Sequence, residues 1–176
     1  SGIIWNNAVQ ATGSLTVTGD GATAASGGTV QNITGADGNG SGYGCGVYLN
    51  KASNVSLSFM NLNNFQNYAV RGLSVNNFTM DRCNITGVNG NNPAYYEGAV
   101  SFGANTGEPG GPLNGLTGSA TISNCTISGG LLENVRVVNQ SGSLNRLTLS
   151  SDTISGAGGN GVLIQGESNA LMNVTV

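Results

Sequence analysis

The feature that most constrains the fold is an internal repeat of 27 residues in the last third of the sequence. A fixed period of roughly 20–50 residues is typical of solenoids, in which each repeat forms one turn stacked on the next. We therefore expect the apolar residues of one repeat to lie directly above those of the following one. The recurring segments are Val135-Arg136-Val137, Leu144 and Leu147-Thr148-Leu149, followed by Val162-Leu163-Ile164, Leu171 and Val174-Thr175-Val176.

A second pattern indicates which residues face the interior. Residues 78–87, 120–129 and 147–156 share the order apolar-x-apolar-x-x-Cys/Asp-x-Ile-Thr/Ser-Gly, and residues 55–62 fit the same frame 23 residues before the first of them. Alternate residues of a strand face the same side. The frame therefore predicts three stacked columns of core residues: Met60, Cys83 and Cys125; Leu57, Met80, Ile122 and Leu149; Leu62, Ile85, Ile127 and Ile154.

The composition favours many short strands joined by tight turns. The chain has 30 Gly among 176 residues and only 7% charged residues, and clusters of Gly, Ser, Thr and Asn interrupt every helical period. Gly permits the positive φ that a corner requires. We predict an all-β fold, a right-handed parallel β-helix (a β-solenoid) of about five to six coils of roughly 23–27 residues. It should form a single domain over residues 1–176, with a longer insertion near 88–118.

The last predicted coil begins at Asn160 and stops at Val176, in the middle of a turn. A solenoid cut there would expose its core, because each repeat is covered by its neighbours. We therefore expect the sequence to be a segment of a longer chain, stacked on neighbouring coils of that chain, or a subunit of an end-to-end homo-assembly.

Several runs resemble the parallel β-helix repeats of large bacterial surface and secreted proteins: residues 14–21 (SLTVTGDG), 27–35 (GGTVQNITG), 134–137 (NVRV) and 160–164 (NGVLI). The resemblance implies an extracellular stalk, adhesin or passenger segment within a longer polypeptide. The broader pectin-lyase-like superfamily shares the fold and includes polysaccharide lyases, glycoside hydrolases and phage tailspikes. Fold alone does not choose among these functions.

Charge and residue types exclude several functions. The net charge is −3 and the five basic residues are scattered, which is not the footprint of a nucleic-acid-binding surface. No apolar run approaches the roughly 20 residues of a membrane-spanning helix, so we expect no membrane insertion. There is no His, and the three Cys form no CxxC pair, so we predict no metal site.

The acidic residues do not form a catalytic pattern. Glycoside hydrolysis needs two carboxyl groups facing one substrate, and no two acids recur at matching positions of adjacent coils. We therefore expect solvated acids, no catalytic residues and no cofactor, with calcium considered only under an enzyme alternative. Asp81 and Arg82 are expected on opposite faces. Asp152 is expected at a coil edge, where its side chain bonds corner N–H groups or turns outward; a buried carboxylate with a shifted pKa is the functional alternative. The acids are Asp20, Asp37, Asp81, Glu97, Glu108, Glu133, Asp152 and Glu167.

The cysteines are expected to serve packing. Cys83 and Cys125 fall in one column, where free buried thiols behave as small hydrophobic groups. A disulfide between these stacked residues is the alternative, with an awkward torsion. Cys45 lies between two glycines and has no predicted partner.

The insertion carries the candidate binding residues, Tyr95, Tyr96, Glu97 and Glu108. Protruding loops often carry binding residues in such folds, and Tyr rings could stack on a sugar or contact a partner. The sequence thus favours a non-catalytic structural or adhesive segment, extracellular or at the cell surface, with a surface glycan or a host or cell partner. The alternatives are a polysaccharide lyase, hydrolase or tailspike-like protein, and a carbohydrate-binding module without catalysis.

Overall fold

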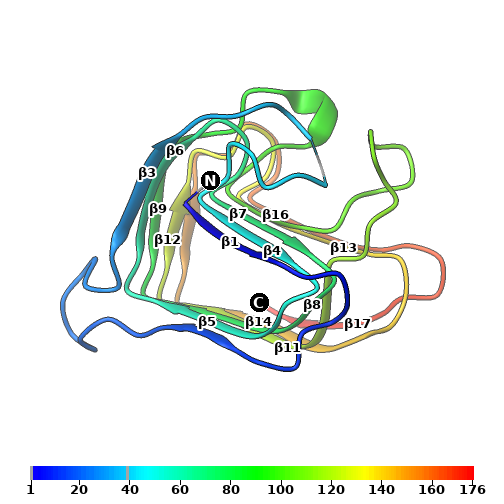
Figure 1. Cartoon of the computed structure of the whole chain (residues 1–176), viewed down its shortest axis with the longest axis horizontal. Coiled ribbons are helices and arrows are strands. Elements are labelled where there is room, and N and C mark those ends of the chain that lie inside the picture. Colours follow the sequence, from blue (N-terminus) through cyan, green and yellow to red (C-terminus); the bar gives the residue numbers. More distant parts are fainter. Residues whose placement is uncertain (1, 39) are drawn as a thin grey trace.

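The structure is a computed structural model that describes residues 2–38 and 40–176. The chain is all-β and winds through three parallel sheets, and each sheet stacks its strands in sequence order (Figure 1). Every third strand therefore returns to the same sheet, one turn further along. This arrangement agrees with the predicted β-solenoid.

Sheet A has six strands, and each pairs in parallel with the strand one turn away. They are β1 (Ile3–Asn6), β4 (Val47–Asn50), β7 (Val70–Leu73), β10 (Val100–Phe102), β13 (Val135–Asn139) and β16 (Val162–Gly166).

Sheet B also has six strands and contains most of the predicted apolar-x-apolar triplets. They are β2 (Leu15–Val17), β5 (Ser53–Ser58), β8 (Val75–Asp81), β11 (Leu116–Ser123), β14 (Ser143–Ser150) and β17 (Leu171–Thr175).

Sheet C has five strands and closes the turn between sheet B and the next strand of sheet A. They are β3 (Thr29–Ile33), β6 (Asn61–Phe65), β9 (Asn84–Asn89), β12 (Thr126–Ser128) and β15 (Thr153–Ser155). The 3₁₀ helix η1 (Pro93–Tyr95) has three residues, and none of the described helices is long and apolar enough to cross a membrane.

The core consists of columns that run along the stack. In sheet B, Leu57 pairs with Met80, Met80 with Ile122, and Ile122 with Leu149. In sheet C, Leu62 pairs with Ile85, Ile85 with Ile127, and Ile127 with Ile154. All of these residues are buried except Ile154, which is partly buried in the last strand of its sheet. The alternation of apolar and small polar residues thus turns ladders of apolar side chains from sheets B and C toward the interior of the stack.

The corner between sheets B and C has a backbone feature that the sequence pattern does not reveal. The residue directly before the Met60, Cys83, Cys125 and Asp152 column adopts a positive φ in four successive turns. A left-handed conformation costs L-residues other than Gly about 1–2 kcal/mol, and Asn and Asp tolerate it best. The residues found there are Phe59 (φ 57°), Arg82 (50°), Asn124 (56°) and Ser151 (56°).

The same corner overturns one expectation about charge. Asp81 and Arg82 were expected on opposite faces, but an ion pair of 2.6 Å joins their side chains. The left-handed backbone of Arg82 turns its side chain out of the strand alternation. The Arg82 guanidinium also lies 5.5 Å from the centre of the Phe59 ring, one turn away.

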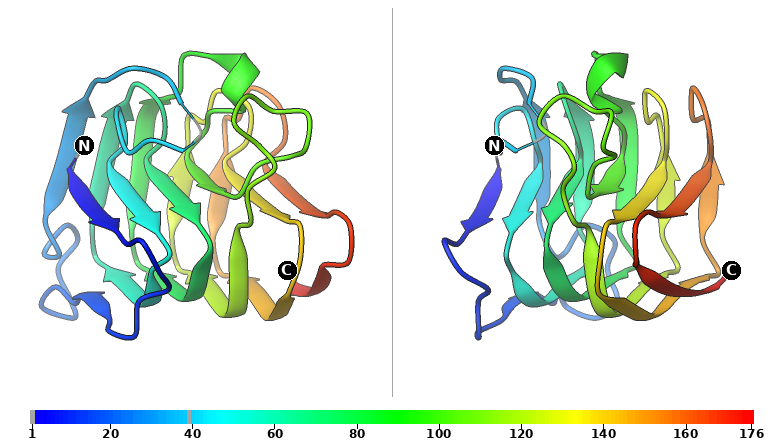
Figure 2. Two further views of the ribbon diagram at one scale, coloured as in Figure 1. Left: turned by 45° about the vertical axis from the view of Figure 1, so that its right-hand side comes forward. Right: turned by 90° about the vertical axis from the view of Figure 1, so that its right-hand side faces the viewer.

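The insertion is shorter at both ends than predicted. Val88 and Asn89 complete β9, and β11 already begins at Leu116. The residues outside the sheets therefore form two loops, 90–99 and 103–115, on either side of β10. With residues 34–38 and 40–46 they gather on the outer side of sheet A (Figure 2). We call these three segments the covering loops.

Candidate functional site

The outer face of sheet A differs from those of the other sheets. The outward row of sheet B is a line of small hydroxyl residues: Thr16, Ser56, Thr79, Thr121, Thr148 and Thr175. The outward row of sheet A holds bulky or charged residues at every position except Ser101: Ile4, Tyr48, Arg71, Ser101, Arg136 and Leu163. The covering loops bury the middle four of these residues. The outer face of sheet A is therefore the one where buried polar side chains and loops come together, which makes it the candidate site.

Two arginines on this face are buried, although the sequence suggested scattered basic residues. Arg71 is 0% exposed and Arg136 is 1% exposed. Arg71 Nη1 donates to Ser101 Oγ (3.1 Å) and to the Gly103 carbonyl (2.7 Å), and Arg136 Nη1 donates to the same carbonyl (3.2 Å). The two guanidinium groups thus hold the start of the loop of residues 103–115 against the sheet.

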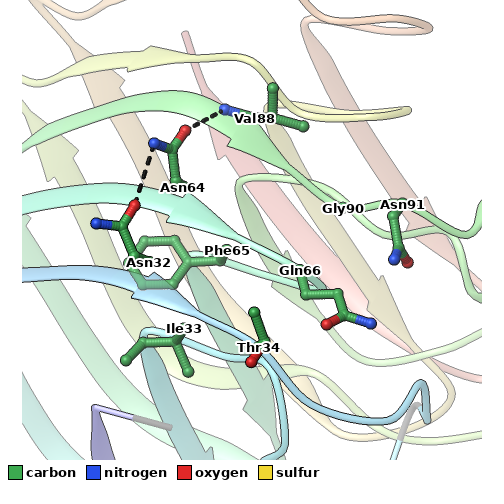
Figure 3. A pocket seen from close by; sticks show the side chains of 9 residues that line it. All are labelled: Asn32, Ile33, Thr34, Asn64, Phe65, Gln66, Val88, Gly90 and Asn91. Carbon is green, nitrogen blue, oxygen red and sulfur yellow. Dashed lines mark hydrogen bonds between the residues drawn. The ribbon is translucent and has the colours of Figure 1, made fainter.

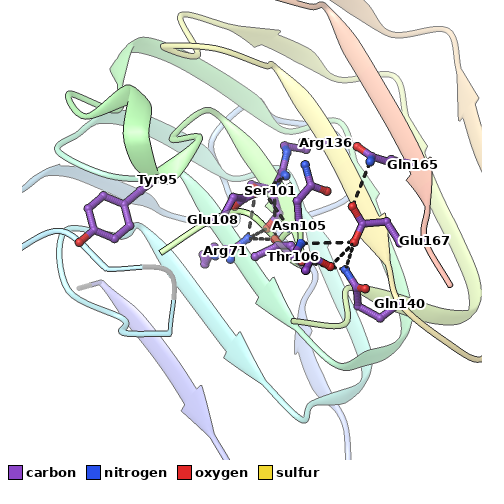
Figure 4. A network of polar contacts seen from close by, with 12 residues as sticks. Arg71, Tyr95, Ser101, Asn105, Thr106, Glu108, Arg136, Gln140, Gln165 and Glu167 are labelled. Carbon is purple, nitrogen blue, oxygen red and sulfur yellow. Dashed lines mark hydrogen bonds and ion pairs between the residues drawn. The ribbon is translucent and has the colours of Figure 1, made fainter. Parts of the chain in front are cut away.

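Glu108, which belongs to the same loop, also contacts the side of the sheet on which these arginines lie. Its carboxylate forms a buried ion pair with Arg136 and accepts a hydrogen bond of 2.8 Å from the Asn105 N–H. Glu167, which directly follows β16, accepts from the Thr106 N–H (3.3 Å) and from Gln140 Nε2 (2.7 Å) (Figure 4). Buried charges persist when paired and hydrogen-bonded. The network therefore holds the loop of residues 103–115 in place.

Three acids expected in solvent are in fact buried: Glu97, Glu108 and Glu133. Glu97 Oε2 accepts from the Asn91 N–H (2.8 Å) and the Asn92 N–H (2.7 Å), which closes the loop of residues 90–99. Burial raises the pKa of Glu97, and these two backbone bonds partly offset the rise. Burial also raises the pKa of Glu133, against the attraction of the Arg136 charge.

The two tyrosines of the insertion have different roles. The Tyr96 ring lies 5.1 Å from the Arg136 guanidinium, a cation–π contact. The Tyr95 carbonyl accepts a hydrogen bond of 2.7 Å from the Tyr68 hydroxyl, and its side chain lines a pocket. Of the four predicted binding residues, Glu97 and Glu108 hold loops, Tyr96 packs on an arginine, and the half-buried Tyr95 lines the pocket.

This pocket, which we call the loop pocket, has a volume of about 430 Å³ and lies where the three covering loops meet. Asn92 Nδ2 donates to Asp37 Oδ2 (2.7 Å) and so ties two of these loops together. Tyr43, which is 64% exposed, shares the lining with Tyr95. The lining residues are Ala36, Asp37, Gly38, Gly40, Ser41, Tyr43, Tyr95, Pro109 and Gly110.

A second hollow, the asparagine groove, has a volume of about 510 Å³ and runs past the end of sheet C (Figure 3). Asn64 Nδ2 donates to Asn32 Oδ1 (3.3 Å), and Asn64 Oδ1 accepts from the Val88 N–H (3.0 Å). Its lining residues are Asn32, Ile33, Thr34, Asn64, Phe65, Gln66, Val88, Gly90 and Asn91. The groove offers amide groups beside apolar surface and contains no charged side chain in this lining.

Asp152 lies at the coil edge, as expected. Its two carboxylate oxygens accept from the Cys125 N–H (2.8 Å) and the Ser150 N–H (3.1 Å). Burial raises the pKa of Asp152, and these bonds partly offset the rise. In the part of the chain that the structure describes, no group of three or more Cys, Asp or Glu residues could hold a metal ion.

Comparison with known proteins adds no relative: no family model, curated protein or solved structure matches the chain.

Proposed function

We propose that this chain is a non-catalytic structural and adhesive segment of an extracellular protein, built as a right-handed parallel β-helix of about six coils. The observation that carries the proposal is the stacking of apolar residues in columns that continue from turn to turn through sheets B and C. Such a column gives a stiff rod in which each repeat contacts its neighbours. The covering loops lie on one side of this rod, over the outer face of sheet A.

As a structural element, the rod is proposed to extend by stacking on a second copy, head to tail. An apolar hollow of about 370 Å³ opens at the last turn and is lined partly by Leu149, Ile154 and Val162. The partly buried Trp5, Leu15 and Val30 of the first turn have the complementary apolar character. Edge strands present unpaired backbone groups that further strands can pair with.

Sedimentation of the chain over a range of concentrations tests this stacking. Val174 pairs with the core residue Leu147, whereas Thr175 is in the outward row of the same strand. Val174→Asp should abolish concentration-dependent assembly, and the matched control Thr175→Asp should leave it intact. A wild-type chain that stays monomeric at every concentration would refute the stacking.

As an adhesive element, the loop pocket is proposed to bind a surface glycan. Tyr43 and Tyr95 offer aromatic faces for a sugar ring, and Asp37 offers an acceptor for its hydroxyl groups. Binding of the chain to an immobilised glycan panel should be lost in Tyr43→Ala and Tyr95→Ala. Asn32→Ala, in the asparagine groove, is the control and should bind normally. Binding that survives both tyrosine variants would exclude the loop pocket.

A polysaccharide lyase or hydrolase is the alternative from another class. Hydrolysis requires a second carboxyl group opposite the first, and in the loop pocket the lining contributes Asp37 alone. This favours binding without bond cleavage. New reducing ends or unsaturated products released from a bound glycan would overturn the non-catalytic assignment.

A further inference from the structure

Cys83 and Cys125 occupy the same corner in adjacent turns of the stack. Both are buried, with 2% and 1% exposure, and all three cysteines of the chain are free in the structure. The Thr126 N–H donates to the Cys83 carbonyl (3.0 Å), so the two corners are directly hydrogen-bonded to each other. The two cysteines thus occupy matching positions of adjacent turns.

The two thiol groups interact with each other. The Cys83 N–H donates to Cys125 Sγ at 3.4 Å, which places that sulfur over the neighbouring backbone. A hydrogen bond between the two thiols lowers the pKa of Cys83 and raises the pKa of Cys125. Adjacent strands lie about 4.8 Å apart, within the roughly 4.4–6.8 Å between Cα atoms that a disulfide spans.

The unfavourable torsion expected for a disulfide between stacked residues applies to regular strands, and these two cysteines lie at a corner instead. Neither cysteine lies in a strand: Cys83 falls between β8 and β9, and Cys125 between β11 and β12. Each directly follows a residue with positive φ, Arg82 or Asn124. A small torsional change at either corner can therefore bring one sulfur onto the other without disturbing the register of two strands.

We propose that Cys83 and Cys125 are a redox pair that forms a disulfide between adjacent coils when the chain folds in the presence of a small-molecule disulfide. One thiolate attacks the small disulfide and forms a mixed disulfide, and one thiolate leaves. The second cysteine thiolate then attacks the protein sulfur of the mixed disulfide and releases the other small thiol. Two electrons pass from the cysteine pair to the small disulfide, and the two protons end on the released thiols.

The bond has a defined consequence for the covering loops. The chain between Cys83 and Cys125 contains both loops of the insertion, residues 90–99 and 103–115. A disulfide would thus join the two ends of the segment that carries Tyr95 and Glu108, and so restrict its motion relative to the stack. This inference does not depend on the proposed function, because it concerns a modification of the fold itself.

Cys45 provides a built-in control for specificity. It lies in a separate apolar cluster with Tyr48 and Tyr68, and its sulfur is 3.3 Å from the Tyr43 carbonyl. In an unfolded chain, 38 residues separate Cys45 from Cys83 and 42 separate Cys83 from Cys125. Loop-closure entropy varies only slowly with length, so random oxidation would form both disulfides in similar amounts.

The test is to refold the reduced chain of residues 1–176 in a buffer of reduced and oxidised glutathione, trap free thiols by alkylation, and map the disulfides by mass spectrometry. The expected result is a fall from three free thiols to one, with Cys83 joined to Cys125 in the folded chain. Oxidation in denaturant should instead give mixed pairs. The Cys45→Ser variant should form the same disulfide, with the yield unchanged.

Two results would overturn the proposal. One is a folded chain that keeps all three thiols through the oxidising refold, and the other is a folded chain with Cys45 in the disulfide. Cys83→Ser should leave no intramolecular disulfide. If that variant does not fold, the peptide map of wild type and of Cys45→Ser still decides the question.

Discussion

Gly129 and Gly156 allow the cost of close stacking to be measured apart from the cost of backbone conformation. Each follows a core isoleucine by two residues, Ile127 or Ile154, in adjacent turns. Both have a left-handed backbone, with φ of +74° and +65°. A Cβ added at Gly129 would lie 1.7 Å from the Gly87 carbonyl oxygen, whereas one added at Gly156 would meet no atom within 4 Å.

The two alanine variants should therefore differ in a predictable way. Gly156→Ala is strained by about 1–2 kcal/mol in a left-handed backbone, partly offset by about 0.5–1 kcal/mol of unfolded-state entropy. A net loss of about 1 kcal/mol follows. Gly129→Ala has the same strain and also pushes against a backbone carbonyl that cannot rotate away. Overpacking of this kind costs about 1–3 kcal/mol more.

Urea unfolding followed by circular dichroism would measure the two losses, with equal slopes as the sign that the unfolded states are comparable. Gly87→Ala should fall between them, because the atom met there is the movable Asn64 Oδ1, at 2.1 Å. Equal losses for Gly129→Ala and Gly156→Ala would refute the reasoning that the close Gly87 carbonyl oxygen adds a packing cost at Gly129.

Two further predictions concern the buried charges. Glu108→Gln should lower the free energy of unfolding in urea by about 3–5 kcal/mol, because it leaves Arg136 buried without its countercharge. Asp81→Asn, at the more exposed ion pair with Arg82, should lower it by at most about 1 kcal/mol. Comparable losses for the two variants would contradict this reasoning. Because burial raises the pKa of Glu133 above 4.5, the folded chain holds this proton more tightly than the unfolded chain does. Wild type should therefore gain stability relative to Glu133→Gln as the pH falls through the raised pKa toward 4.5, and a pH-independent difference between the two would count against this.

The sequence predicts the stacked core well because its signal is local. Each apolar-x-apolar triplet shows its inward face directly, and the repeat spacing then aligns residues such as Met80 and Ile122 across turns. The basic residues were expected only to be scattered, whereas Arg71 and Arg136 lie side by side with Ser101 in the outward row of sheet A. Their burial comes from the covering loops, which fold back over the sheet through contacts far apart in sequence.

The loop pocket escaped prediction for a similar reason. Tyr43 stands in a stretch of Gly and polar residues without any alternation, so no pattern assigns its direction. It meets Tyr95 in the loop pocket only because two loops from different turns are tied together through Asp37 and Asn92. The nearest sequence signal was the presence of exposed aromatic residues in segments outside the repeat frame.

The unequal lengths of the turns have a consequence for the order in which the chain folds. The second and third turns are offset by 23 residues in all three sheets, as in the pairs Val47 with Val70, Val55 with Phe78 and Asn61 with Asn84. The first turn must close 44 residues to pair Ile3 with Val47. Since a shorter loop loses less entropy on closure, β4 to β9 should form the folding nucleus, onto which the flanking turns are then wound one at a time.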